Sequence, residues 1–459
     1  MPGSWRTLCE RAVRVEKKVE NTLSGWLEHI EALHSKPIDM GLERMVEMIR
    51  RMGISFAGKT VITVGGTNGK GSTCAMLERI YRAAGYTTGM HTSPHLLRIN
   101  ERCVVNGEEV SDETLMAAFR EVETTRGEMT LSYFEYTALA FLKIFQAAGL
   151  DVVILEIGLG GRLDAINTID SNAAVIATVG LDHCAYLGNT REAIGAEKAC
   201  IYRSGCPAVF SGEDVPQSVR AYVEKTGAKR LFAGEDFEKT VLADGTWNLT
   251  VGDTVYKGLP RPGLEGLNQY ANAAGVLATV TALMARLPVS RAAIETGLTD
   301  VRLAGRFETV LRTPVPVVID VGHNPQAAEV LARNIAATKR PGERTFAVFG
   351  MLADKDMQGV ASILRSSFDE WYIASLTGPR AATAEQLREA MLAAGIDPRH
   401  IRSWPDVRSA LCAAREDALM LVTSPVEMQS DEPVRIIVFG SFVTVTAAAE
   451  IFRAEGIAI

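Results

Sequence analysis

The sequence predicts an α/β protein of at least two domains, each built around a parallel β-sheet. Three observations lead to this fold class. A short buried strand at 60–64 is followed by a glycine-rich turn and a helical pattern. From Pro316 onwards, apolar strand patterns alternate with helical patterns. The chain has 459 residues, which is too long for one ordinary core and suggests two or three domains.

The composition is that of a soluble globular protein, with 47% hydrophobic and 22% charged residues. A net charge of −7 argues against a general affinity for nucleic acid or anionic membranes. The seven cysteines are scattered and form no C-x-x-C pair, so neither a disulfide framework nor a structural zinc site is indicated. Neither a signal-peptide pattern nor an apolar run of about 18 residues is present. We therefore expect a cytoplasmic protein.

The first predicted elements are helices over 11–34 and from Gly41 to about Met52. Pro37 ends the first helix and begins a connecting loop. Charged residues of this loop, Lys36 and Asp39, are as consistent with solvated side chains as with functional ones.

The next element is the stretch K-T-V-I-T-V-G-G-T-N-G-K-G-S-T at 59–73. A strand, a glycine-rich turn and a helix N-terminus form an anion cradle, to which Lys70 adds a full positive charge. The strict P-loop spacing is not met, because only three residues separate Gly65 from Gly69 and Gly71 follows the lysine. A plain glycine turn is the alternative, but the order of the parts favours nucleotide phosphates. The helix is expected to end at Gly85.

Further strands are predicted at 87–91, 152–157 and 173–179, and polar residues follow or end each of them. Ser93 lies just after the first, Glu156 near the end of the second, and Asp182 with His183 after the third. Ligand sites collect at the carboxyl ends of parallel strands. A strand-end acid beside a phosphate cradle holds Mg²⁺ in P-loop enzymes.

Several nearby residues have an ordinary structural explanation. His95 is expected to be a loop or surface histidine, and Lys198 a solvated lysine. Helices are predicted at 113–123 and 133–148, and the L-S-Y-F-E segment before the second is more typical of packing than of ligand binding. Turn signals and short alternating stretches predict a small antiparallel sheet at about 208–258, followed by a helix at 268–284.

A domain boundary is expected between Asp300 and Arg306, giving domains 1–300 and 301–459. In the second, strands are predicted at 317–321, 345–351, 371–375 and 435–440. Helices alternate with them, one capped by Thr383 with Gln386 three residues later. This pattern predicts a parallel, Rossmann-like sheet. No G-x-G-x-x-G opens it, so a dinucleotide is not implied.

The predicted architecture is thus a P-loop-containing N-terminal ATPase domain with an antiparallel appendage, joined to a Rossmann-like C-terminal α/β domain. No Ser-His-Asp or Cys-His nucleophile set is visible. The residues by themselves indicate an enzyme that uses ATP or GTP with Mg²⁺.

The motifs taken together resemble the folylpolyglutamate synthase/dihydrofolate synthase family, members of the Mur ligase superfamily. They occur in the family's order: G-T-N-G-K-G-S-T, T-S-P-H-L, L-E-I-G-L-G-G-R-L-D-A, G-L-D-H, E-K-A, G-R-F-E, D-V-G-H-N-P, A-D-K-D and V-F-G-S-F-V-T-V. The resemblance covers almost the whole chain. It implies that ATP converts a carboxylate to an acyl phosphate, which the α-amine of L-glutamate attacks.

The resemblance also implies site residues, cofactors and partners. The substrates would be 7,8-dihydropteroate, reduced folates and L-glutamate, used with ATP and one or two Mg²⁺ ions by a monomer. The catalytic residues would be Lys70, His183, His323 and a carbamylated Lys198. Mg²⁺ ligands would be Ser93, Glu156, His183 and Lys198. Nucleotide contacts would come from Thr67, Asn68, Gly69, Lys70, Gly71, Ser72, Asn272, Arg306 and Asp320. Pterin contacts would come from Pro37, Ile38, Asp39, Ser132, Tyr133, Phe134, Leu163, Asp164 and Ala165.

Two departures from the family pattern are visible. Asn268-Gln269 stands where many relatives have His-Gln, and Val321-Gly322 replaces Gly-Ala between Asp320 and His323. L-S-Y-F-E resembles the bifunctional bacterial type; the alternative is a monofunctional dihydrofolate synthase or folylpolyglutamate synthase. A Mur-type cell-wall ligase is disfavoured because the P-loop begins too early for an extra N-terminal domain. A non-ligase P-loop ATPase would not need the D-x-x-H-N segment.

Overall fold

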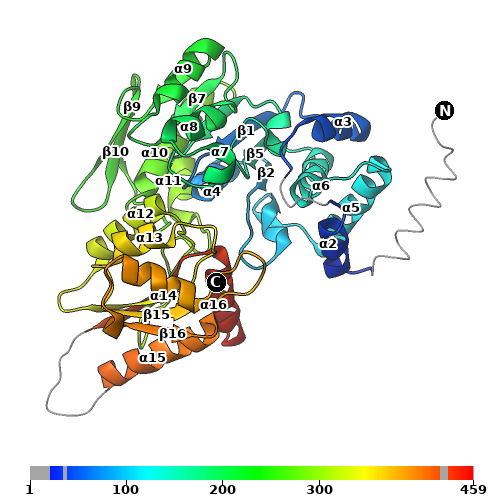
Figure 1. Ribbon diagram of the computed structural model, residues 1–459. Helices are drawn as coiled ribbons and strands as arrows, with labels where there is room; N and C mark the ends of the chain where they lie inside the picture. Colours follow the sequence, from blue (N-terminus) through cyan, green and yellow to red (C-terminus); the bar gives the residue numbers. More distant parts are fainter. Residues whose placement is uncertain (1–20, 35–38, 424–432, 458–459) are drawn as a thin grey trace. The chain divides into compact units, whose positions relative to one another are not determined.

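The computed structural model describes residues 21–34, 39–423 and 433–457 (Figure 1). The chain divides into two compact units. Among the described residues, the first unit comprises residues 21–179, Thr190–Arg261 and Asn272–Val301. The second comprises Gly180–Asn189, Pro262–Ala271 and residues 302–457. The chain thus leaves the first unit twice, for ten residues each time, before its last passage into the second unit.

The first unit is built on an eight-stranded sheet with the order β4-β3-β2-β5-β1-β6-β7-β8. Six strands are parallel to one another: β2, β5, β1, β6, β7 and β8. β3 and β4 add antiparallel pairs at one edge. The strands are β1 (Thr60–Gly65), β2 (Thr88–His91), β3 (Cys103–Val105), β4 (Glu108–Glu109), β5 (Val152–Glu156), β6 (Ala173–Ile176), β7 (Pro207–Phe210) and β8 (Lys229–Phe232).

The central strands are buried throughout, as expected for a parallel sheet covered on both faces. Their register places Val64 of β1 beside Glu156 of β5 and Val175 of β6, while His91 of β2 pairs with Leu155. The carboxyl ends of four strands therefore meet at one edge. This edge positions the residues of the candidate site.

The helices of the first unit agree with most of the predicted spans. α2, α3, α5 and α6 pack against one another (Figure 1). The helices are α2 (Leu23–Glu31), α3 (Glu43–Met52), α4 (Lys70–Ala83), α5 (Asp112–Arg126), α6 (Tyr133–Ala148), α8 (Arg191–Ala199), α9 (Gln217–Thr226), α10 (Gln269–Leu283, mostly in this unit) and α11 (Arg291–Asp300), with 3₁₀ turns η1 (Ile99–Arg102) and η2 (Ala165–Thr168).

The antiparallel sheet is shorter than the sequence predicted. It consists of β9 (Phe237–Val241), β10 (Trp247–Val251) and β11 (Thr254–Leu259). The assignment of 208–236 to this sheet is wrong, because β7, α9 and β8 extend the parallel sheet instead. The alternating pattern that indicated hairpins belongs to 237–259 alone, whereas Pro207–Phe210 is a buried apolar strand typical of a parallel sheet.

The second unit contains a six-stranded sheet with the order β12-β13-β17-β14-β15-β16. β12 is antiparallel to β13, so the sheet is mixed where a parallel one was expected; β12 and β16 were not predicted. The strands are β12 (Glu308–Leu311), β13 (Val317–Asp320), β14 (Arg344–Phe349), β15 (Glu370–Ala374), β16 (Ile401–Trp404) and β17 (Val434–Phe439).

Apart from α7, which lies in the 180–189 segment, the helices of this unit alternate with its parallel strands. They are α7 (Cys184–Leu187), α12 (Pro325–Thr338), α13 (Met357–Leu364), α14 (Ala384–Ala393), α15 (Val407–Thr423) and α16 (Phe442–Ala454), with the 3₁₀ turn η3 (Pro398–His400). An aromatic group of Phe349, Phe368, Trp371 and Phe439 forms part of its core. Among the described residues, no helix is both long and apolar enough to cross a membrane.

Candidate active site

The glycine-rich turn between β1 and α4 is held in place by the residues that follow β6. The Thr67 N–H donates to the carbonyl of Thr178 at 2.8 Å, and the Asn68 N–H donates to the Thr178 hydroxyl at 3.1 Å. Gly66 has a φ of 141°, and a Cβ there would lie 3.1 Å from two backbone nitrogens. Gly69 adopts the left-handed conformation immediately before Lys70. Glycine is therefore needed at both positions, and the turn is preformed.

Lys70, Glu156 and Ser93 lie together beside this turn. Glu156 ends β5 with 3% exposure, and its Oε1 lies 3.8 Å from the Lys70 ammonium nitrogen. Its Oε2 accepts the Ser93 N–H at 3.0 Å. The buried carboxylate thus has both a cation and a backbone donor, which offset the cost of burying its charge.

The donor set at Glu156 and Ser93 fits Mg²⁺. Within the described part of the chain, no three His, Cys, Asp or Glu side chains form a group that would enclose a metal ion. Mg²⁺ rarely uses such a cage: it is usually held by one or two carboxylates, substrate phosphates and water. The buried Glu156 carboxylate beside the phosphate cradle supplies a hard oxygen ligand of the kind that this ion prefers, and Ser93, whose N–H bonds to it, carries a hydroxyl that could supply another.

Lys198 in α8 is buried, so the expectation of a solvated lysine is wrong. The side chain is 4% exposed and its ammonium donates to the Gly66 carbonyl at 2.9 Å. α8 packs closely on the L-G-L-G-G-R-L-D-A loop, because a Cβ at Gly161 would lie 3.0 Å from the Lys198 Cα. The fold therefore brings Lys198 directly to the glycine-rich turn.

Asn272 in α10 approaches the same turn from another side. It is buried, and a Cβ at Gly69 would lie 2.6 Å from its amide oxygen. The first unit therefore gathers the six predicted nucleotide residues 67–72, which include Lys70, with Asn272, Glu156, Ser93 and Lys198 around one turn.

Two of the three predicted pterin segments also meet in the first unit. Ser132 caps α6 through a capping box with Glu135. The Phe134 ring lies against Gly158, where an added Cβ would be 2.8 Å from the ring and 3.4 Å from the Asp164 carboxylate. Asp164 accepts N–H bonds from Leu159 and Ile166, and burial raises its pKa to about 6.

The third pterin segment is connected to these through an arginine. The Asp39 carboxylate accepts from Arg44 at 2.8 Å, and Arg44 also donates to Glu135 at 3.0 Å, one residue from Phe134. Asp39 is therefore not an isolated solvated residue. Pro37 and Ile38 lie outside the described residues.

The second unit holds a separate cluster centred on Asp182. Its carboxylate lies 2.5 Å from the Lys355 ammonium and 3.3 Å from Nε2 of His323, and accepts from the Asn324 amide at 3.1 Å. Burial would raise the pKa of Asp182, but the hydrogen bond from His323 and the Lys355 charge outweigh it and lower the pKa well below its usual range. The cluster is thus held by charge.

The remaining predicted residues of the second unit are His183, Asp320 and Arg306. His183 has a φ of 51° and precedes α7. Asp320 accepts from the N–H groups of Phe307 and Gly322, and burial raises its pKa. The Arg306 guanidinium lies 5.3 Å from the centre of the Phe442 ring. Ser93 and Glu156 belong to the first unit and His183 to the second, so their joint role as metal ligands stays a prediction.

Sequence reasoning missed several residues of these clusters, including Arg44, Thr178 and Lys355. It also missed Arg102, whose Nε donates to the loop residue His95 at 2.8 Å and which lies over the Tyr133 ring. For Lys355 the signal was present, because the A-D-K-D turn follows the end of a predicted strand. Arg44 and Arg102 carry no local pattern that distinguishes them from surface arginines.

Comparison with known proteins agrees with this geometry. Residues 64–257 match the Mur ligase middle domain, and residues 305–425 match the glutamate ligase domain of Mur ligases. The chain is 42% identical over 433 residues to the dihydrofolate synthase/folylpolyglutamate synthase of Escherichia coli strain K12, covering 94% of this chain and 96% of that protein.

Solved structures give the same result. E. coli FolC in complex with DHPP and ADP matches with a TM-score of 0.86 at 40% identity, covering 95% of this chain and 99% of that one. A Yersinia pestis bifunctional folylpolyglutamate synthase/dihydrofolate synthase complexed with AMPPNP and Mn ion matches with a TM-score of 0.84 at 39% identity, covering 95% and 98%. The chain belongs to the dihydrofolate synthase/folylpolyglutamate synthase family of Mur ligases.

Proposed function

We propose that this protein is an ATP-dependent ligase that adds L-glutamate to 7,8-dihydropteroate and to the glutamate tail of reduced folates. One observation carries the proposal: a chain of this family places Lys70, Glu156 and Ser93 together at a preformed glycine-rich turn. The ADP- and AMPPNP-bound relatives support ATP as the co-substrate, and the Mn-bound relative supports a divalent metal.

The reaction joins two anions, so its main requirement is to neutralise and align charge. The N–H groups of residues 67–72 and the α4 N-terminus bind the phosphates, and Lys70 offsets the charge on the transferred phosphoryl group. The terminal phosphoryl group of ATP passes to the carboxylate of the acceptor, which gives an acyl phosphate and ADP. The glutamate amine then attacks the acyl carbon and loses a proton, and phosphate leaves as the amide forms.

Ser93 and Glu156 would hold Mg²⁺, together with His183. The ion supplies positive charge that offsets the phosphate and carboxylate groups of the reactants. A carbamate on Lys198 would turn a buried cation into a carboxylate that supports a second ion. Its burial beside Gly66 supports this role, because the group is already at the turn.

The proposed pterin contacts are supported by the interactions between the three segments that carry them. Phe134, Asp164 and Asp39 belong to segments that are linked through Gly158, Arg44 and Glu135, which supports a common pterin site for residues 37–39, 132–134 and 163–165. In the second unit, Arg306 and Asp320 are proposed to contact the nucleotide and His323 to take part in catalysis.

The first experiment measures incorporation of labelled glutamate by the purified protein with Mg²⁺ and ATP. Dihydropteroate and tetrahydrofolate are supplied in separate reactions, and we expect label in both products. Label with one acceptor alone would make the enzyme monofunctional. ATP hydrolysis without label in either product would contradict the folate substrates while leaving the ligase fold intact.

Removal of metal tests the ion independently of the acceptor. EDTA should abolish incorporation, and added Mg²⁺ or Mn²⁺ should restore it; full activity in EDTA would contradict the metal role. The domain limits 1–300 and 301–459, the cytoplasmic location and the monomeric state remain predictions of the sequence. Sedimentation analysis of the purified protein would test the last of these.

A further inference from the structure

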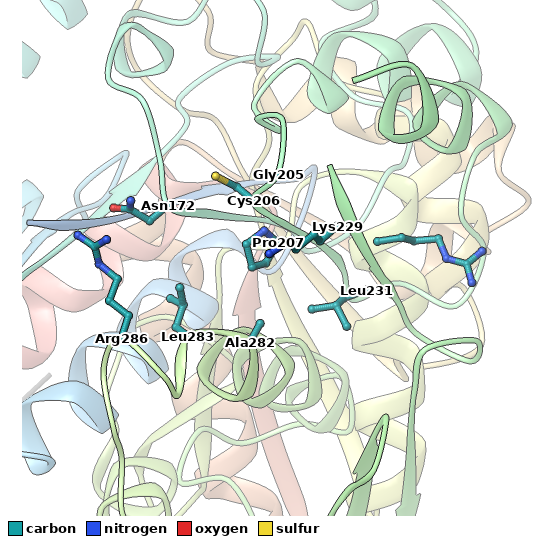
Figure 2. A pocket seen from close by; sticks show the side chains of 10 residues that line it. Asn172, Gly205, Cys206, Pro207, Lys229, Leu231, Ala282, Leu283 and Arg286 are labelled. Carbon is teal, nitrogen blue, oxygen red and sulfur yellow. The ribbon is translucent and has the colours of Figure 1, made fainter. Parts of the chain in front are cut away.

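A pocket opens in the first unit at the amino ends of the parallel strands. It encloses about 430 Å³ and is lined by, among others, Asn172, Cys206, Lys229, Leu231, Leu283 and Arg286. This volume lies within the range of roughly 300–1,000 Å³ that is typical of small-molecule pockets. Figure 2 shows Asn172 and Arg286 at one side of the view and Lys229 with Leu231 at the other.

The pocket is distinct from the glycine-rich turn. Asn172 immediately precedes β6 and Lys229 begins β8, whereas the turn follows the opposite end of β1. The six residues of β1 span about 17 Å at the usual rise per residue. The pocket therefore lies at the other edge of the sheet and belongs to neither the nucleotide nor the pterin residues.

Two cations at the pocket have no acidic partner among the described residues. The exposed ammonium of Lys229 has neither a hydrogen bond nor an ion pair in the described part of the chain. Arg286 donates through Nε to the Thr60 hydroxyl and through Nη2 to the Lys59 carbonyl, both at 2.8 Å. These bonds hold the guanidinium in place but do not neutralise its charge.

The neighbouring arginine shows the usual alternative. Arg230, which follows Lys229 in β8 and also lines the pocket, pairs with both Glu235 and Asp236. Acidic side chains are thus present in this part of the surface, but within the described structure they pair with Arg230 and not with Lys229 or Arg286. Lys229 and Arg286 therefore line the pocket as positive charges without an acidic partner among the residues that the structure describes, beside the apolar side chains of Leu231 and Leu283.

We propose that this pocket binds a small organic anion, with a carboxylate or phosphate group attached to an apolar body. The apolar part would displace water from the leucine side chains, and the anionic group would pair with Lys229. Arg286, at the other side of the pocket, adds positive charge to it. Asn172 already accepts the Val61 N–H through its side-chain oxygen, which leaves its amide N–H groups as additional donors.

Cys206 provides a direct measure of occupancy, because this free, half-buried thiol lines the pocket. The rate of its alkylation by N-ethylmaleimide is followed by mass spectrometry of the peptide that contains it. The probes are 2-naphthoate and 2-naphthyl phosphate, with neutral 2-naphthylmethanol and inorganic phosphate as controls. We expect saturable protection by one or both organic anions and none by either control.

The naphthoate and naphthyl phosphate arms distinguish a carboxylate site from a phosphate site. Equal protection by 2-naphthylmethanol would overturn the proposal, because charge would then play no part. Absence of protection by every probe at millimolar concentration would overturn it as well.

A matched pair of variants tests the charge. Lys229→Gln should weaken protection about fivefold, the upper range for one solvent-exposed ion pair. Lys225→Gln removes the same charge from an exposed lysine of α9 outside the lining and should leave protection unchanged. If the two substitutions weakened protection equally, the effect would come from the overall surface charge and not from a specific site, which would overturn the proposal. Neither residue belongs to the proposed active site, so glutamate ligation by both variants checks their folding.

Discussion

At the residue scale, the chemistry depends on charges that the fold holds close together at the glycine-rich turn. Lys70 and Glu156 are 3.8 Å apart, and Lys198 donates to the carbonyl of Gly66. Glu156 and Lys198 are largely shielded from water, so the effective dielectric constant around them is low. Their electrostatic interactions are therefore stronger than those of surface charges. Changes at these residues should therefore strongly lower the rate of the reaction.

Lys70→Ala should lower the rate of glutamate ligation by about 100-fold or more, because a charge that stabilises the transferred phosphoryl group is lost. Incorporation of labelled glutamate measures the rate, and a cooperative melting transition shows that the variant is still folded. Lys257→Ala, at an exposed lysine of β11, is the control and should retain full activity. Unchanged turnover of Lys70→Ala would remove Lys70 from the phosphate cradle.

Lys198→Ala should also lose about 100-fold in rate if a carbamate at this position supports the metal. Short carboxylic acids such as acetate should then restore part of the activity, since the carboxylate would occupy the space left by the side chain. The same acids should not rescue Lys70→Ala, in which a cation is missing. Full activity of Lys198→Ala without added acid would rule out the carbamate.

At the scale of elements, local sequence signals determine where helices begin and end. The predicted cap at Thr383 forms a capping box with Gln386, and Gly85 stands just after the C-cap of α4 with a φ of 89°. How helices pack is decided by distant residues. A buried cluster joins α2, α5 and α6: Glu123 contacts His29, Arg126 and the Tyr136 hydroxyl.

Glu123→Gln should lower the free energy of unfolding by about 3 kcal/mol, because the buried Arg126 would lose its counter-ion. Burial alone would raise the pKa of Glu123, but hydrogen bonds from His29 and Arg126 and the Arg126 charge lower it to about 2. Because the pKa of Glu123 is lower in the folded than in the unfolded state, the carboxylate stabilises the fold at pH values above its unfolded pKa of about 4.5. This contribution is lost as the pH falls towards 2.

The melting temperature of the wild type should consequently fall more steeply than that of Glu123→Gln as the pH is lowered from about 5 to about 2.5. Glu121→Gln, on the exposed side of α5 with a partner in Lys143, should change stability by less than about 1 kcal/mol. Equal effects of the two substitutions would contradict a structural role for the cluster.

At the scale of the whole molecule, the chain contributes to both units along a discontinuous path. Residues 180–189 and 262–271 belong to the second unit, although the segments around them belong to the first. Asp182 in the first of these excursions pairs with Lys355, and both side chains are at most 8% exposed. This pair ties residues far apart in the sequence within the second unit.

Asp182→Ala should destabilise the protein by about 3 kcal/mol, because Lys355 would remain buried without its counter-ion. The double variant Asp182→Ala/Lys355→Met should recover much of this loss. A double-mutant cycle, with the stability of each variant measured by thermal unfolding, tests this. Asp354→Ala breaks an exposed pair with Arg380 and should cost little. A double variant no more stable than Asp182→Ala would mean that the ion pair is not what stabilises this excursion.

The sequence alone determined the family, the fold class and the strand–turn–helix at 60–83. The family follows from motifs that occur together in one order along the chain. The fold class and the strand–turn–helix follow from backbone preferences, glycine positions and apolar periods, which act between neighbouring residues. It also placed Glu156 at the end of a strand, whereas β6 ends at Ile176 and Asp182 lies beyond it, in the second unit. Only the tertiary structure decided that Lys198 is buried, that 207–232 extends the parallel sheet, and that Arg44 links Asp39 to Glu135. Burial and ion pairing join residues as far apart in the sequence as Asp182 and Lys355, 173 positions, so a local pattern such as the A-D-K-D turn does not show which partner a side chain has.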